Sequence, residues 1–507
     1  MKSRTIARQK LIREIDEEIA VLQARRHALV MTCDISGAIM APIRKLPIEL
    51  LAEIIIKCIP PLPTKRRRSS SMSRSEAQVY PEDVGELLGK VCRAWRTIIN
   101  DEPRIWSTVV LDKTIQAPED INQLLKKSKS HPLDIFLEPC TWFSTADQEN
   151  YDVVFKMLHS QLWRTRTFIA DMRSFPRAVS GGIFPQGFSI NAPMMQTFTH
   201  IRNSSPPVKH DLGTFHGPRL CSIILKHSRN LVRSLVANPV QTVRHLEVSF
   251  SRGSTVLYLQ LLSALPNLSS LYWNGKDYVE QVQGATVVLN SLKALRLQTA
   301  KSAMDLLSFL HAPSLECLEL LLGWGSVSMV PEIIGTLCGD GVVKLRHLHI
   351  LEGLTFESGP DVGAMLGQLD CLETMIIEHS AMLGDLLTAL SLQDRDFSSV
   401  CPQLTTLVVL HSKILPGSFL DFVHRRTRAD WEEAVPGLVT SLKLDKTTLH
   451  KTNVKSCTRL AQTHSATIHF MSEDEYQDTS LAYIVQDEGD RFTEDSWPDF
   501  GWEYASD

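Results

Sequence analysis

Residues 290–320, NSLKALRLQTAKSAMDLLSFLHAPSLECLEL, contain two copies of a short apolar pattern separated by a helical one. In each copy an apolar residue is followed by a second three positions later and by a third two positions after that. The copies are Leu292-Leu295-Leu297 and Leu315-Leu318-Leu320. The residues between them have the spacing of one buried helix face, namely Ala303, Leu306, Leu307 and Leu310. The stretch therefore predicts a strand, a helix and a second strand.

The same triad recurs along much of the chain, and successive copies start between 23 and 35 residues apart. The other copies are Met195-Phe198-His200, Leu220-Ile223-Leu225, Val243-Leu246-Val248, Leu268-Leu271-Trp273, Leu345-Leu348-Ile350, Leu372-Met375-Ile377, Leu404-Leu407-Val409 and Val439-Leu442-Leu444. Such an interval is the signature of stacked supersecondary units. Looser units are expected earlier, with strands at 106–111, 133–137 and 167–170 and helices around 121–127 and 151–158. Alternating strand and helix patterns predict βα repeats with parallel strands.

This pattern resembles leucine-rich repeats, which form a curved solenoid with strands on the concave side and helices outside. The predicted fold class is α/β, with an N-terminal helical module followed by an irregular leucine-rich-repeat-like solenoid over 109–470. Irregularity is expected because the family pattern places Asn or Cys five residues after the second apolar position. Of the ten such positions here only Asn203 is Asn, and Ser228 is typical of the rest. A non-solenoid α/β domain is the alternative.

The first 41 residues predict an amphipathic helix over 8–30. Ile12, Ile15, Ile19, Leu22 and Leu29 follow an a/d spacing that only Arg26 interrupts. A coiled coil with another chain is one interpretation. The seam is shorter than the three to four heptads that argue for a coiled coil, so a helix packed on its own protein, or marginal alone, is favoured.

Two further helices are expected over 42–108. Residues 42–60, PIRKLPIELLAEIIIKCIP, place Pro47 in a first turn and then a broad apolar stripe. Residues 84–99 predict one continuous helix with Trp95 on its apolar face. The residues on these faces exceed what two short helices can hide between themselves, so part of the surface is expected to meet a partner, with Trp95 as an anchor. The alternative is that this face packs against the following repeats.

The Leu46-Pro47-x-Glu-Leu-Leu motif, followed by Val91-Cys92-Arg-x-Trp-Arg and a hydrophobic-Trp closure, resembles an F-box. That resemblance implies docking onto a Skp-family adaptor, which links the module to a cullin–RING ubiquitin ligase. The expected adaptor-binding residues are Leu46, Pro47, Leu50, Leu51, Ile54, Val91, Cys92 and Trp95. The chain departs from a simple F-box in having a long insertion between the two helices.

That insertion, residues 60–83, contains four successive basic residues, Lys65 to Arg68, followed by serines, and its composition predicts a disordered loop. Ser69 and Ser70 are candidate phosphorylation sites for a basic-directed kinase. The basic cluster is also a candidate nuclear-import signal. A solvated loop with neither role is the simpler interpretation.

Residues between the apolar strand positions should lie on the concave side as a largely solvated face. The candidate target-binding residues are Tyr272, Arg296, Glu319, His347, His349 and Glu378. Their mixed charges suit a protein or peptide surface better than a phosphate backbone, which would require clustered cations.

Composition agrees with a protein-binding role. The net charge of −4 gives no reason to expect a nucleic-acid partner, and no run of apolar residues is long enough to span a membrane. The charged N-terminus does not resemble an export signal. The ten cysteines are scattered without a CxxC pair, and none of the HExxH, GxxxxGK[ST], GxSxG or GxGxxG motifs occurs. We therefore expect no metal, no cofactor and no catalytic residue.

The C-terminal segment, residues 471–507, carries twelve acidic residues and one base, Arg491. It is expected to be a disordered tail, or alternatively one that folds back on the basic side of the chain or binds a partner through its aromatic residues.

Together these patterns favour a substrate-receptor subunit of a cullin–RING ligase that acts in the cytoplasm, the nucleus or both, with an unknown protein target. The alternatives are a leucine-rich-repeat scaffold without ligase association, in which the helices only cap the solenoid, and an enzyme with a motif-free site.

Overall fold

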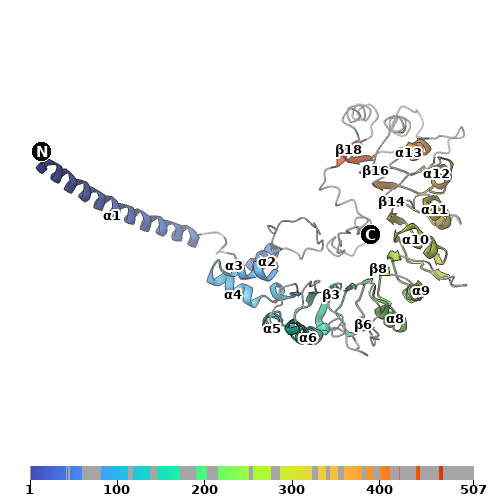
Figure 1. Cartoon of the computed structure of the whole chain (residues 1–507), viewed down its shortest axis with the longest axis horizontal. Helices are drawn as coiled ribbons and strands as arrows, with labels where there is room; N and C mark the ends of the chain where they lie inside the picture. The colour runs from blue at the N-terminus through green and yellow to red at the C-terminus, as the bar shows by residue number, and fades with distance from the viewer. Residues whose placement is uncertain are drawn as a thin grey trace. The chain divides into compact units, whose positions relative to one another are not determined.

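The computed structural model describes residues 2–40, 43, 46–59, 81–111, 118–137, 145–171, 190–201, 215–250, 255–275, 286–321, 329–338, 343–351, 359–378, 384–391, 400–410, 422, 441–445 and 467–471. These residues belong to two compact units (Figure 1). The first ends at Trp106 and the second begins at Ser107.

The first unit is helical. Its elements are α1 (Lys2–Met40), α2 (Ile48–Cys58), α3 (Pro81–Gly89), α4 (Arg93–Asp101) and the 3-10 helix η2 (Pro103–Trp106). Helix α1 is longer at both ends than the predicted 8–30. Helix α2 follows Pro47 and carries Glu49 in its first turn and Lys57 in its last. Each charge has the sign that the helix dipole favours at that end.

The prediction of one continuous helix over 84–99 was wrong. The helix stops at Gly89, and the backbone becomes extended at Cys92, with φ −159° and ψ 170°, before α4 begins. The Arg96 guanidinium compensates for the break, because its Nε donates to the Gly89 carbonyl at 3.1 Å and so satisfies a group at the end of α3. Apolar spacing alone does not reveal this break, because the apolar residues of the two short helices together follow the spacing of one longer helix.

The second unit contains a 14-stranded sheet in the part of the chain that the structure describes. Every pair of neighbouring strands is parallel, and the strands follow their sequence order. The strands are β1 (Thr108–Leu111), β2 (Leu133–Leu137), β3 (Thr165–Asp171), β5 (Thr197–Ile201), β7 (Ser222–Lys226), β8 (His245–Phe250), β9 (Ser270–Gly275), β11 (Ala294–Gln298), β13 (Cys317–Leu321), β14 (His347–Leu351), β15 (Thr374–Glu378), β16 (Thr406–Leu410), β17 (Ser441–Asp445) and β18 (Thr467–Met471).

Helices connect these strands, and Figure 1 shows α8 to α13 along the outer side of the second unit. The helices are α5 (Pro118–Lys127), α6 (Thr145–His159), η3 (Leu162–Arg164), α8 (Arg229–Ala237), α9 (Thr255–Ser263), α10 (Ala300–Leu307), α11 (Val330–Cys338), α12 (Gly359–Leu366) and α13 (Gly384–Ser391). Two short parallel pairs accompany them, β4 (Ile190–Asn191) with β6 (Phe215–His216) and β10 (Val287–Val288) with β12 (Leu310–His311). The α/β solenoid class predicted from sequence is confirmed.

The strand register confirms the repeat residue by residue. The second positions of successive triads are paired across the sheet, as Leu271 with Leu295 and Leu295 with Leu318. The third positions pair in the same way, as Trp273 with Leu297 and Leu297 with Leu320. All of these residues are buried in one continuous core with the helix faces. Each repeat therefore completes the core of its neighbours, as stacked units must.

Backbone hydrogen bonds join successive repeats at the start of each strand. The amides of Ser269 and Ser270 both donate to the carbonyl of Arg244, at 2.8 and 3.0 Å. The same two-to-one arrangement recurs at the carbonyls of Gln196, Cys221, Ser269, Lys293, Glu316, Arg346 and Glu373. We call each such set of two amides and one carbonyl a joint between repeats. It consists of main-chain groups only. At one position where the family pattern would have Asn, the Ser228 hydroxyl lies within hydrogen-bond distance of the carbonyls of His200 and Lys226, at 3.1 and 3.0 Å.

A tight turn precedes most strands, and its signal was missed in the sequence. Among the described residues, the first residue of eight of the triads donates its amide to the carbonyl three residues earlier, as Leu315 does to Ala312. Proline occupies the second turn position at five of these sites, where its fixed φ suits a type I turn. These prolines are Pro193, Pro218, Pro266, Pro313 and Pro402. Strand β18 was also missed, and its last residue, Met471, lies in the segment assigned to the tail.

Among the described residues, no helix has both the length and the apolar character that crossing a bilayer requires.

Candidate functional site

The helical unit has a small core of its own. Leu51 and Ile55 of α2 pack in one cluster with α4 and η2, and their side chains are 7% and 0% exposed. The other buried members are Ala52, Ile98, Ile99, Ile105 and Trp106. Leu51, which was predicted to bind an adaptor, therefore lies inside the unit and acts in its internal packing.

The predicted adaptor-binding residues differ widely in exposure. Leu50 and Ile54 lie one turn apart on α2 and are 52% and 40% exposed, while Val91 is 61% exposed. Leu46 and Pro47 are also exposed at the start of α2. Cys92 and Trp95 are half-buried, and Trp95 packs against the core cluster. Leu50 and Ile54 are neighbours on one face of α2, and exposed aliphatic side chains that lie together are candidates for an interaction surface.

Two exposed apolar residues of the same unit were not among the predicted site residues. Ile48 is 59% exposed on the first turn of α2, and Leu87 is 65% exposed on α3. Sequence periodicity placed Leu87 on an apolar face, but it does not distinguish the part of such a face that packs internally from the part that remains outside.

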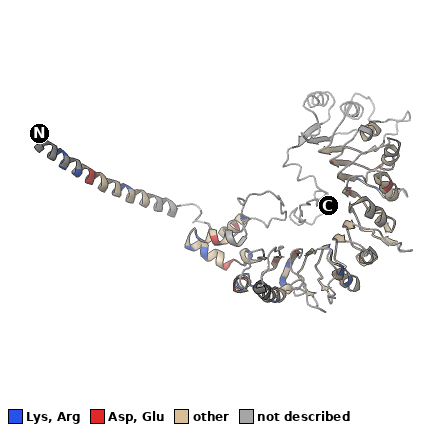
Figure 2. Ribbon diagram, in the orientation of Figure 1, with Lys and Arg blue, Asp and Glu red and all other residues tan. Residues whose placement is uncertain are grey.

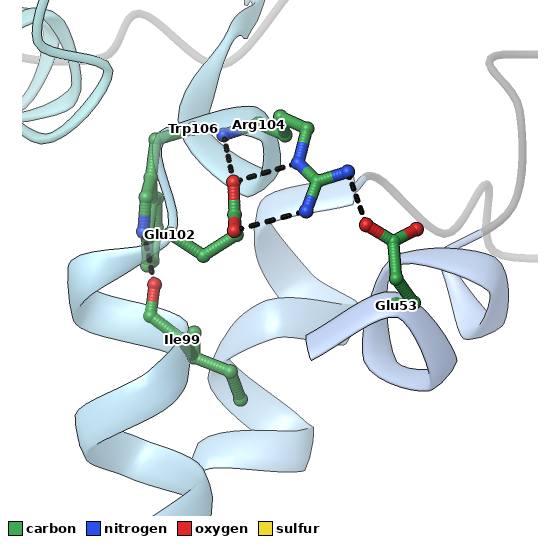
Figure 3. Close-up of polar contacts among 5 residues, drawn as sticks. All are labelled: Glu53, Ile99, Glu102, Arg104 and Trp106. Atoms are coloured by element: carbon green, nitrogen blue, oxygen red, sulfur yellow. Dashed lines mark hydrogen bonds and ion pairs between the residues drawn. The ribbon is translucent and has the colours of Figure 1, made fainter. Parts of the chain in front are cut away.

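Polar contacts fasten η2 to the helices (Figure 3). The Arg104 guanidinium donates to both carboxylate oxygens of Glu102, and its Nη1 lies 2.6 Å from Glu53 Oε1 on α2. Hydrogen bonds to the two carboxylates raise the pKa of Arg104, so it stays charged at any ordinary pH. Trp106 donates its indole N–H to the Ile99 carbonyl at 2.7 Å within the core. These contacts hold η2 against α2 and α4.

In the second unit, the predicted target-binding residues form a continuous polar row across adjacent strands. In register across β9, β11, β13 and β14 lie Tyr272, Arg296, Glu319 and His349. The Arg296 guanidinium lies 5.0 Å from the centre of the Tyr272 ring, and its Nε lies 3.2 Å from Glu319 Oε1. These side chains thus contact one another across the strands.

The row continues through a histidine between two carboxylates. His349 Nε2 lies 2.9 Å from Glu378 Oε1, and Nδ1 of the same ring lies 3.8 Å from Glu319 Oε1. The expectation that this face is largely solvated was wrong for most of these residues. Tyr272, Glu319, His349 and Glu378 are 3–6% exposed. Arg296 and His347 are only partly buried and are the more accessible members.

Two neighbouring features were missed because neither has a local sequence signal. Lys226 Nζ lies 2.8 Å from Glu247 Oε1, on adjacent strands, with both side chains almost buried. At the other end of the row, three residues form an apolar cluster separate from the main core, namely Ile376, Val408 and Leu410. The row therefore has charged groups at β7 and β8 and aliphatic groups at β15 and β16.

Titratable groups at the first positions of these strands are held neutral. Burial, together with the nearby charge of Arg244, lowers the pKa of His245 to about 4. Burial also lowers the pKa of His347 and raises that of its register partner Cys317 to about 12. A cysteine nucleophile requires a lowered thiol pKa, so Cys317 has the opposite of the required electrostatics.

Among the residues that the structure describes, no group of three or more His, Cys, Asp or Glu side chains is placed to hold a metal ion. Ser69, Ser70 and the rest of the 60–80 stretch lie outside the described residues, as does the C-terminal segment from 472 onward.

Comparison of the sequence with protein-family models finds no matching family, and a search of curated proteins finds no match. The class that the fold defines is an α/β solenoid of parallel strands preceded by a helical unit.

Proposed function

We propose that this chain is a substrate-receptor subunit of a cullin–RING ubiquitin ligase. The helical unit would be an F-box that binds a Skp-family adaptor, and the solenoid would bind a protein target. The chain itself would perform no chemistry. It would hold the target near the ligase and so raise its effective concentration. Activity in the cytoplasm, the nucleus or both is part of this proposal.

One observation carries the proposal. Helix α2 divides its apolar residues between two faces, with Leu51 and Ile55 filling the core while Leu50 and Ile54 are half exposed. A unit this small does not leave such side chains in water without a cost, because each aliphatic side chain gains ~1.5–3 kcal/mol on burial. The order of the two motifs, at Leu46–Leu51 and Val91–Arg96, supports a Skp-family adaptor as the partner of this face.

Adaptor binding can be tested without unfolding the unit. Substitution of Leu51 or Trp95 would disrupt the core, so the informative variant is Leu50→Asp with Ile54→Asp. We expect it to abolish co-purification of the Skp-family adaptor and the cullin. The matched control is Val288→Asp, which places a charge on another half-exposed aliphatic residue, in the solenoid. Undiminished adaptor recovery with the double variant would contradict the proposal.

Mass spectrometry of the same purifications separates the two halves of the function. Proteins that remain bound to Leu50→Asp/Ile54→Asp but are lost from Arg296→Ala would be candidates for the target, because Arg296 is one of the accessible members of the polar row. A wild-type chain that retains other proteins but never the adaptor would instead identify a solenoid scaffold without ligase association.

The proposal includes phosphorylation of Ser69 and Ser70 by a basic-directed kinase as a control point. Loss of phosphate incorporation in Ser69→Ala/Ser70→Ala would support it, and unchanged incorporation would contradict it.

A further inference from the structure

Helix α1 is a long helix with its apolar residues in water. It runs over 39 residues, which is ~58 Å at ~1.5 Å per residue. Every α1 side chain whose placement the structure describes is exposed. Ile15, Ile19, Leu22 and Leu29 are 46–59% exposed. The favoured expectation, that this helix packs on its own protein, is not met by the described residues.

These four residues lie on one stripe of the helix. Their spacings of four, three and seven keep them on the seam that faces a partner helix in a coiled coil. Val21, which is 67% exposed, lies off that seam on the same turn as Leu22. A seam of β-branched and leucine side chains fits the interdigitation of two helices, whereas a flat surface would not require this spacing.

The charges of α1 are divided along its length (Figure 2). Arg8, Lys10 and Arg13 come first, Asp16, Glu17 and Glu18 then lie beside Ile15 and Ile19, and Arg25 and Arg26 lie between Leu22 and Leu29. Two parallel copies would place like charges together, including Arg26 against Arg26 at a seam position. Two antiparallel copies would place the acidic segment of each against the basic segment of the other. With Ile19 opposite the second copy's Leu22, Glu18 would face Arg25.

We propose that α1 binds a second copy of this chain as an antiparallel two-helix coiled coil. The charge pattern is self-complementary only in that orientation, and like charges opposed in the parallel one are unfavourable. The short seam and the two layers in which Arg26 of one copy faces Ile15 of the other make the pairing reversible. The dimer presents two copies of the helical unit and of the solenoid, and it is independent of whether the helical unit binds an adaptor.

Sedimentation velocity of the full chain over a concentration series tests the pairing. The wild type should shift from monomer to dimer as concentration rises. Ile19→Asp/Leu22→Asp should weaken association by at least about tenfold, and Val21→Asp, the matched exposed position off the seam, should leave it unchanged. A wild type that is monomeric throughout, or a seam variant that behaves like Val21→Asp, would overturn the proposal. An unchanged denaturation midpoint of the solenoid shows that the variants are folded.

A charge exchange tests the orientation. Glu18→Arg and Arg25→Glu should each weaken the dimer, and the two together in one chain should restore it, because each new arginine then faces a new glutamate. In a parallel pair these positions do not face each other, so a double variant no tighter than the single ones would overturn the antiparallel arrangement. A photo-crosslinking residue in place of Gln23 gives an independent measure of the orientation of the two helices. Capture of the second copy near Asp16 supports the antiparallel pair, and capture near Gln23 contradicts it.

Discussion

Lys226 and Glu247 form an ion pair of 2.8 Å between adjacent strands β7 and β8, with side chains only 10% and 7% exposed. Removing two charges from water is costly, and their attraction compensates for this cost only while both are present. Because the pair lies on the sheet, at one end of the polar row, its integrity affects the surface proposed to bind the target.

Removing one partner of this pair should therefore cost more than removing both. Lys226→Met should lower the unfolding free energy by ~3–5 kcal/mol, because Glu247 is left as an uncompensated buried charge. The double variant Lys226→Met/Glu247→Leu should recover most of that loss. Denaturant titrations of the three proteins give the comparison. Equal losses in the single and double variants would show that the carboxylate is not buried in solution.

Two arginines of the early repeats offer a matched test of burial. Arg164 is 2% exposed and donates to the carbonyls of Lys129, His131 and Leu125 near the end of α5, as well as to Ser128 and Gln161. Arg164→Met should cost ~2–4 kcal/mol, since it leaves several buried acceptors without a donor.

The control is Arg166→Met. Arg166 pairs with Asp134 but is 46% exposed, so its loss should cost at most ~1 kcal/mol. Thermal or urea unfolding distinguishes the two variants. Similar losses for both would mean that pairing, and not burial, determines the effect.

The helical unit permits a similar comparison, between a buried neutral hydrogen bond and a more exposed ion pair. Trp106→Phe removes a buried donor from the Ile99 carbonyl and should lower the stability of this unit by ~1–3 kcal/mol. Arg104→Met removes the more exposed ion pairs with Glu53 and Glu102 and should cost ~0–1 kcal/mol. Hydrogen exchange of the α4 amides measures both. A larger effect for Arg104→Met would contradict this order.

Acid should weaken the solenoid through His245. Its pKa in the folded chain is about 4, below the ~6.5 of an unfolded histidine, so the unfolded state binds the proton first as pH falls. Stability is therefore lost between about pH 6.5 and pH 4 and does not fall further from this group below that range.

For a half-buried side chain the loss should be on the order of 1–3 kcal/mol. The measurement is the difference in urea midpoint between pH 7.5 and pH 5. His245→Gln should lose less stability than the wild type over this interval. If both lose the same amount, other groups, such as His347 with its lowered pKa, account for the acid sensitivity.

The repeat and its register could be predicted from the sequence because burial acts on every copy in the same way. Leu295 and Leu318 are paired in the sheet and belong to the same buried row that the triads predict. A single position repeated many times is a strong signal, even where the intervals vary.

Features that depend on one contact between particular side chains could not be predicted in this way, because they do not recur along the sequence. The end of α3 at Gly89 depends on the Arg96 guanidinium seven residues later, and the burial of Glu319 depends on partners from strands on both sides. Nor could apolar spacing separate Leu51, which fills the core, from Leu50 beside it, because both satisfy a broad helical stripe. The sequence thus predicted candidate residues on α2 and on the sheet, but only the structure distinguished the buried ones from the exposed ones.

The joints between repeats have a consequence for how such a chain can change over generations. Because each joint consists of two amides and one carbonyl, it places little demand on the side chains at that point, and only the shared core limits which repeat can follow another. A segment of roughly one repeat can be duplicated or deleted by recombination while the seams on either side reform. The length of the array and the residues it displays are therefore free to diversify faster than its architecture.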